Sequence, residues 1–168
     1  FKDLITFSQQ NDLVIFAEDN GDKTEELRKT LKELDIPGIK IFLFALKKNE
    51  NIINDNYANI SAYPKNCVAY TSTHDTETLL SYLRAFTREQ KQNLAAAASI
   101  SYEPDDKIFA KRVRDAIITS PAQIIIIPIQ DWLLTTDRIN IPGTELPIND
   151  PNWNFHLKTP IEKLPTHF

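Results

Sequence analysis

The chain has 168 residues, a net charge of −4 and a pI of about 5.4, so it can bury one core and lacks the basic surface typical of nucleic-acid binders. Its single cysteine, Cys67, excludes an internal disulfide and a cysteine-based metal site, and it favours a cytoplasmic location. The longest apolar run, residues 124–129, is too short to cross a bilayer. Because the first residue is Phe1 rather than Met, we expect the chain to be part of a longer protein.

Apolar runs at four places predict buried strands. They are residues 13–17, 39–46, 67–70 and 124–129. Most of these runs are almost continuously hydrophobic, which is typical of parallel strands that helices cover on both faces. Pro128 lies late in the last run, so we expect that strand to end there.

Helical spacing of leucines and other apolar residues fills most of the intervals between these runs. Leu27, Leu31 and Leu34 recur at the spacing of one helix face, for example. The predicted helices are residues 24–34, 78–86, 87–98 and 104–118, and residues 47–66 read as a long loop. The alternation predicts an α/β fold with parallel strands, a single domain over residues 1–168 and a tail from about residue 137 that wraps the surface.

Acidic residues follow three of the four predicted strands. Glu18 and Asp19 follow the first run, His74 and Asp75 follow the third, and Asp131 follows the fourth. In α/β folds the reacting groups gather at the carboxyl ends of the strands, so these side chains are expected at one rim. Two carboxylates that converge there suit acid–base chemistry at a glycosidic bond.

Structural roles compete with this interpretation. An acidic residue after a strand often caps the following helix, as Asp19 or Asp22 would. A single His74 is more often a structural hydrogen-bonding group than a catalytic one, and Trp153 in the tail is more often a packing anchor than a surface for sugars. Cys67 lies in a buried run and is expected to be inert.

Five segments, taken in order, resemble the amylomaltase (4-alpha-glucanotransferase, disproportionating enzyme) group of the alpha-amylase clan. The similarity extends over about residues 13–157. The best example is Tyr-Thr-Ser-Thr-His-Asp at residues 70–75, which is similar to the family's Tyr-Thr-Gly-Thr-His-Asp. The other segments are residues 16–21, residues 34–41, residues 128–133 followed by 138–144, and residues 152–157.

The resemblance implies a partial domain. The family fold is a (β/α)8 barrel of the TIM type, and the four runs would be its strands five to eight, the C-terminal half. The family's nucleophilic Asp sits at the end of the strand before these, and no matching segment precedes Leu13. We therefore expect the isolated chain to be inactive, and we expect its exposed sheet edges to promote self-association.

The resemblance also implies an activity and a site. The family transfers α-1,4-glucan segments, from maltooligosaccharides, starch or glycogen, to glucose or another sugar acceptor with retention, and it needs no metal or organic cofactor. Glu18 would be the acid and then the base, and Asp75 would hold sugar hydroxyls at the point of cleavage. His74, Asp19 and Asn140 would bind substrate. The alternative is a non-catalytic carbohydrate-binding or structural half-barrel.

Overall fold

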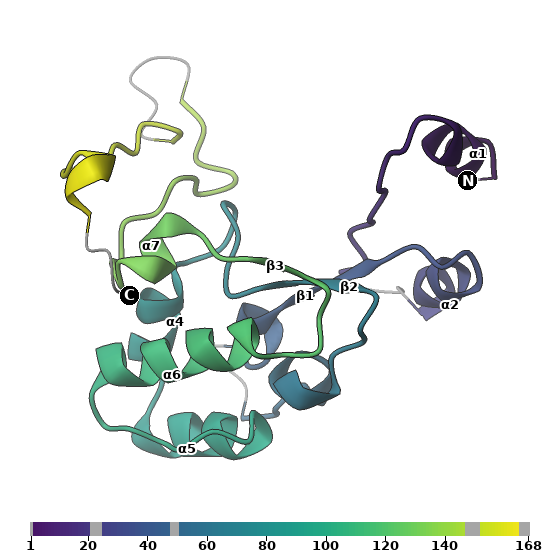
Figure 1. Ribbon diagram of the computed structural model, residues 1–168. Helices are drawn as coiled ribbons and strands as arrows, with labels where there is room; N and C mark the ends of the chain where they lie inside the picture. The colour runs from purple at the N-terminus through teal and green to yellow at the C-terminus, as the bar shows by residue number, and fades with distance from the viewer. Residues whose placement is uncertain (1, 21–24, 48–50, 147–151, 165–168) are drawn as a thin grey trace.

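A sheet of three parallel strands forms the centre of the protein. The computed structural model describes residues 2–20, 25–47, 51–146 and 152–164. Strands β1 (Gly38–Ile41), β2 (Cys67–Tyr70) and β3 (Ile124–Ile126) are hydrogen-bonded in that order (Figure 1). Ile41, Tyr70 and Ile126 lie in register, so their side chains share one face of the sheet. The predicted α/β class with parallel strands is thereby confirmed.

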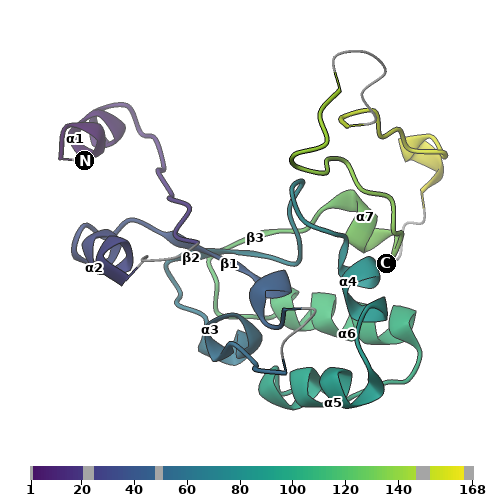
Figure 2. The ribbon, with the colours of Figure 1, turned by 180° about the vertical axis from the view of Figure 1, so that it is seen from behind.

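Helices α4 (Leu79–Arg84), α5 (Arg88–Ala97) and α6 (Asp106–Ile118) gather on one side of the sheet in both views (Figures 1 and 2). Each begins at a residue whose side chain accepts a backbone N–H: Thr78, Thr87 and Asp105 respectively. These helices therefore start close to where their sequences predict. The fully buried side chains of this core include Val68, Leu79, Leu83, Leu94, Phe109, Val113 and Ile117.

The first apolar run is a correction, because residues 13–17 form no strand. Leu13 is 54% exposed and Val14 is 74% exposed. The segment connects helix α1 (Lys2–Gln10), which the sequence patterns did not predict, to the rest of the fold (Figure 1). Its main-chain contact with the sheet region is the bond from the N–H of Ala17 to the carbonyl of Pro37, at 2.9 Å. An apolar run becomes a buried strand only if a neighbouring strand pairs with it. No strand in the described residues pairs with this segment.

The second and fourth predicted runs form shorter strands than predicted, whereas β2 has the predicted bounds. Strand β1 gives way to a 3-10 helix over Phe42–Phe44, and β3 stops before Pro128, as predicted, after which helix α7 (Ile129–Trp132) begins. Helix α2 (Glu25–Glu33) lies within its predicted range. The predicted loop at 47–66 contains the short helix α3 (Asp55–Ala58) and a 3-10 turn at Ile60–Ala62, and its residues 48–50 lie outside the described ranges.

The described parts of the tail follow α7 and extend beyond it, away from the sheet and from helices α5 and α6, so they do not wrap the surface as predicted (Figures 1 and 2). Its described parts, residues 137–146 and 152–164, contain one 3-10 turn at Ile161–Lys163, and residues 147–151 and 165–168 lie outside the described part. None of the helices in the described ranges has the length and apolar content needed to cross a bilayer.

Candidate active site

A groove of about 420 Å³ lies over one face of the sheet. Its floor comes from residues of one face of the three strands, including Ile41, Tyr70 and Ile126. Its polar rim includes Glu18, Ser72, Thr73, His74, Asp75 and Thr76. The structure therefore brings Glu18, His74 and Asp75 to one groove, with strand β1 lying between the segment of Glu18 and strand β2.

Asp75 is held on two sides by hydrogen-bonding groups. The amide Nδ2 of Asn140 donates to Oδ1 of Asp75 at 2.7 Å, and Nε2 of His74 lies 3.3 Å from Oδ2. Nη2 of Arg138 donates to the backbone carbonyl of Asp75 at 3.1 Å. The side chains of His74 and Asp75 are still 55% and 52% exposed. The carboxylate is therefore oriented by the tail and remains accessible from the groove.

Asp131 does not reach the groove, which corrects the expectation of a third acidic side chain at the rim. It is 1% exposed and accepts hydrogen bonds from the hydroxyls of Thr71 at 2.5 Å and Ser72 at 2.6 Å. Its second oxygen accepts the backbone N–H of Leu79 at 2.7 Å. Burial raises the pKa of Asp131, and these hydrogen bonds act in the opposite direction. Asp131 thus ties the end of β2 to the start of α4, on both sides of the loop that carries His74 and Asp75.

Asp19 points away from the groove. It is 5% exposed, its Oδ1 accepts the backbone N–H of Ile39 at 2.9 Å, and its Oδ2 lies 3.3 Å from Nε of Arg28. Side chains alternate along an extended chain, so anchoring Asp19 to the far face leaves Glu18 on the groove side. The structure therefore does not place Asp19 with the predicted substrate-binding groups. The start of α2 adjoins residues 21–24, which lie outside the described residues, so the predicted cap by Asp19 stays a prediction. Asp22, the other predicted cap, lies outside the described residues.

Glu18 is exposed and lines the groove close to Tyr70. Burial raises the pKa of the Tyr70 hydroxyl, and the negative charge of Glu18 adds to this shift. The tyrosine therefore stays neutral at physiological pH beside the carboxylate. A carboxyl group beside a neutral phenol, open to solvent on one side, can exchange protons with a bound hydroxyl or glycosidic oxygen.

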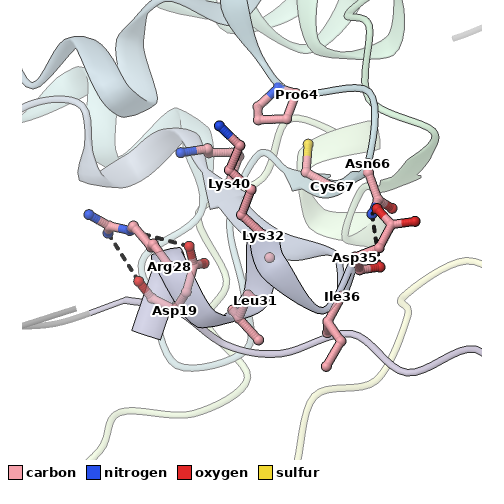
Figure 3. Close-up of a pocket in the computed structure, with 11 residues that line it drawn as sticks. Asp19, Arg28, Leu31, Lys32, Asp35, Ile36, Lys40, Pro64, Asn66 and Cys67 are labelled. Atoms are coloured by element: carbon pink, nitrogen blue, oxygen red, sulfur yellow. Dashed lines mark hydrogen bonds and ion pairs between the residues drawn. The ribbon is translucent and has the colours of Figure 1, made fainter. Parts of the chain in front are cut away.

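A second cavity of about 380 Å³ lies between α2, the start of β1 and residues 64–67 (Figure 3). Several of its polar groups have partners: Arg28 contacts Asp19, and Asn66 donates to Oδ1 of Asp35 at 2.8 Å. Cys67 lines the cavity, and burial raises the pKa of its thiol to about 11. The thiol is thus protonated at neutral pH, which agrees with the predicted inert core role. We therefore assign the residues around this cavity a structural role: Arg28 and the backbone of Ile39 hold Asp19, the neighbour of Glu18.

Replacing Gly38 with alanine should destabilise the fold, because an added Cβ would lie 2.9 Å from Oδ2 of Asp19. We expect a loss of about 1–3 kcal/mol in the free energy of unfolding, the usual cost of overpacking. Urea denaturation of the wild type, Gly38→Ala, Asp19→Ala and the double variant measures it. If the contact with Asp19 is the cause, Gly38→Ala costs less in the Asp19→Ala background. An equal cost in both backgrounds would contradict this explanation.

Comparison with known proteins gives a consistent set of similarities. The sequence profile of a family described as 4-alpha-glucanotransferase matches residues 1–162. The chloroplastic/amyloplastic 4-alpha-glucanotransferase of Solanum tuberosum is 30% identical over 145 residues, covering 85% of this chain and 23% of that protein. The 4-alpha-glucanotransferase of Clostridium butyricum is 31% identical over 150 residues, covering 88% and 28% respectively. The chain therefore spans between a fifth and a third of the length of these relatives.

Solved structures show the same relationship at the level of the fold. The amylomaltase from Streptococcus agalactiae, solved in complex with acarbose, superimposes with a TM-score of 0.70 and 26% identity. The match covers 92% of this chain and 30% of that chain. The amylomaltase from Corynebacterium glutamicum matches with a TM-score of 0.56 at 16% identity, over 84% of this chain and 24% of that one. The parallel sheet and its helices thus correspond to part of an amylomaltase fold.

Proposed function

Because the chain belongs to the 4-alpha-glucanotransferase family of glycoside hydrolase family 77, we propose that it supplies the C-terminal half of the catalytic barrel of such an enzyme. In this proposal the described strands and the segment before α2 take the places of barrel strands five to eight. The observation that carries the proposal is the single groove that Glu18 shares with His74 and Asp75. In barrels of this type the reacting groups gather at the carboxyl ends of the strands, and the loop after β2 supplies His74 and Asp75.

Retaining transfer requires two displacements at the anomeric carbon. In the first, a carboxylate attacks the anomeric carbon while Glu18 protonates the departing glycosidic oxygen. In the second, Glu18 takes the proton of the acceptor 4-hydroxyl as that oxygen displaces the enzyme carboxylate. Glu18 suits this role because it faces the groove, whereas its neighbour Asp19 is fixed on the opposite side.

Asp75 would bind the 2- and 3-hydroxyls of the sugar at the cleavage point. Such hydrogen bonds strengthen as positive charge develops on the ring, so they stabilise the transition state more than the bound substrate. Asn140 and His74 support this role because they contact opposite oxygens of the Asp75 carboxylate and fix its direction. In this proposal Asn140 orients the Asp75 carboxylate, and His74 donates a hydrogen bond to the 2- and 3-hydroxyls that Asp75 binds.

The proposed substrates are α-1,4-glucans, with glucose or a short maltooligosaccharide as acceptor. Of the three carboxylates that the mechanism uses, this chain provides Glu18 and Asp75, and the resemblance assigns the attacking one to a segment before Leu13. We therefore expect these residues alone to bind the donor sugar without turnover, since catalytic groups that act as a unit lose most of their effect together.

Replacing Asp75 with alanine tests the proposal. We expect the affinity of the 168-residue chain for maltotriose, measured by isothermal titration calorimetry, to fall about 10- to 100-fold, the equivalent of one or two hydrogen bonds to a charged group. Asp3→Ala, at an exposed position of α1 away from the groove, is the matched control and should bind normally. Equal affinity of Asp75→Ala and the wild type would contradict the assignment. No binding by any variant would favour a purely structural half-barrel.

A further inference from the structure

Trp153 is a large aromatic residue that the fold leaves 63% exposed. Its ring centre lies 5.3 Å from that of His74, with the two ring planes inclined by 41°. His74 in turn lines the groove and lies 3.3 Å from Asp75. The exposed indole therefore extends the groove beyond its polar rim. Burial of the indole does not explain its position, because most of its surface remains in solvent.

The backbone around Trp153 is fixed in an unfavourable conformation. Its φ is 61°, in the left-handed region that bulky residues avoid, which costs on the order of 1–3 kcal/mol. Two contacts hold it there: its N–H donates to the carbonyl of Ile139 at 2.8 Å, and the neighbouring Asn152, 6% exposed, accepts the N–H of Ile141 at 2.9 Å. The tail thus fixes Trp153 to the same strip of chain that carries Asn140. Strain of this kind that leaves a side chain in solvent is typical of functional sites.

The same segment of the tail carries Asn140, a buried side chain with one unused hydrogen-bond acceptor. Asn140 is 7% exposed, and its Nδ2 donates to Asp75 at 2.7 Å. Its Oδ1 is buried and has no hydrogen-bond partner within the described ranges. Buried polar atoms are usually satisfied, so this acceptor has capacity for one more hydrogen bond. Exposed aromatic surface and hydrogen-bonding groups therefore lie within one short stretch of the groove.

We propose that the indole of Trp153 is a stacking surface for one glucose ring of an α-glucan bound in the groove, an inference that rests on the proposed function. A pyranose ring has an apolar face of C–H bonds and an edge of hydroxyls. The negative face of an indole attracts the C–H face, while Asp75, His74 and Asn140 take hydroxyls at the edge. Trp153 then contributes to the affinity for one sugar unit beside the unit that Asp75 binds. This role differs from the packing role expected of a tryptophan in a tail.

The presence of only two tryptophans makes a direct measurement simple. Trp132 is half-buried with the guanidinium of Arg114 4.7 Å from its ring, whereas Trp153 is exposed. In a ¹⁵N-labelled 168-residue chain, titration with maltotriose should shift the indole N–H resonance of Trp153 and leave that of Trp132 in place. If maltotriose shifts the backbone resonances of Tyr70 and Asp75 but not the Trp153 indole, this inference is overturned and the proposed function stands. If maltotriose shifts no resonance, the proposed function fails as well.

Two substitutions separate stacking from a structural role. Trp153→Ala should weaken maltotriose binding roughly 5- to 10-fold, the usual value of one aromatic contact, whereas Trp153→Phe, which keeps an aromatic face, should lose less than half of that effect on a logarithmic scale. Trp132→Phe is the matched control and should bind normally. Unchanged affinity of Trp153→Ala would overturn the proposal. Equal losses in both Trp153 variants, together with lowered melting temperatures, would assign Trp153 to packing and overturn it too.

Discussion

Glu18→Gln is expected to reduce glucan transfer about 10²–10⁴-fold when the chain operates within a complete barrel, because the amide can neither donate nor accept the proton that the mechanism transfers. The chain can be placed in that setting by grafting it into the Streptococcus agalactiae amylomaltase, in place of the segment that it aligns with. Glucose release from maltotriose measures the rate. Glu33→Gln, an exposed position on α2 with the same chemical change, is the matched control and should keep the rate of the unmodified graft.

An activated donor distinguishes a missing acid from a distorted site. Fluoride leaves without protonation, so the Glu18→Gln graft should form its covalent intermediate from α-maltosyl fluoride much faster than from maltotriose. Equal losses on both donors would mean that the substitution damages the groove rather than removing a proton. A rate on maltotriose close to that of the unmodified graft would contradict the assignment of Glu18.

The parts of the fold that the sequence predicted are those that local chemistry determines. Strand β2 has the predicted bounds because its apolar run at residues 67–70 is buried between two neighbouring strands. Helix α5 begins where Thr87 and Gln90 form a capping box, a signal contained in four consecutive residues. The run at 13–17 has the same composition as a strand, yet none of its residues is fully buried, because burial depends on neighbours that its own residues do not specify.

In the candidate site too, local sequence predicted some residues and left others unpredicted. Glu18, His74 and Asp75 could be chosen because they follow predicted strands, and resemblance to a family made them specific. The contacts that orient them could not be chosen, because they join residues far apart in sequence: Asn140 reaches Asp75 over 65 positions, and Asp131 reaches Leu79 over 52 positions. Asp19 and Asp131 illustrate the difficulty. Both are carboxylates after apolar runs, and only the path of the backbone shows that they face inward.

Asp131→Ala should cost about 3–5 kcal/mol of stability, because it leaves the hydroxyls of Thr71 and Ser72 and the N–H of Leu79 without their acceptor, and each unsatisfied buried donor costs about 1–3 kcal/mol. Urea denaturation measures the loss. Asp137→Ala, at an exposed position six residues further along, is the control and should change stability by less than about 0.5 kcal/mol. A loss below about 1 kcal/mol in Asp131→Ala would mean that water replaces the carboxylate in this clamp.

Asp131→Asn isolates the charge of the same group through the pH dependence of stability. Burial raises the pKa of Asp131 in the folded chain above its unfolded value, so ionisation of this residue favours the unfolded state. The stability that the neutral acid provides is complete below the unfolded pKa and is lost as the pH rises through the folded pKa. The difference in unfolding free energy, wild type minus Asp131→Asn, should therefore fall as the pH rises through this window. A difference that grows with pH would show that the hydrogen bonds from Ser72, Thr71 and Leu79 outweigh burial and keep the carboxylate ionised in the folded protein.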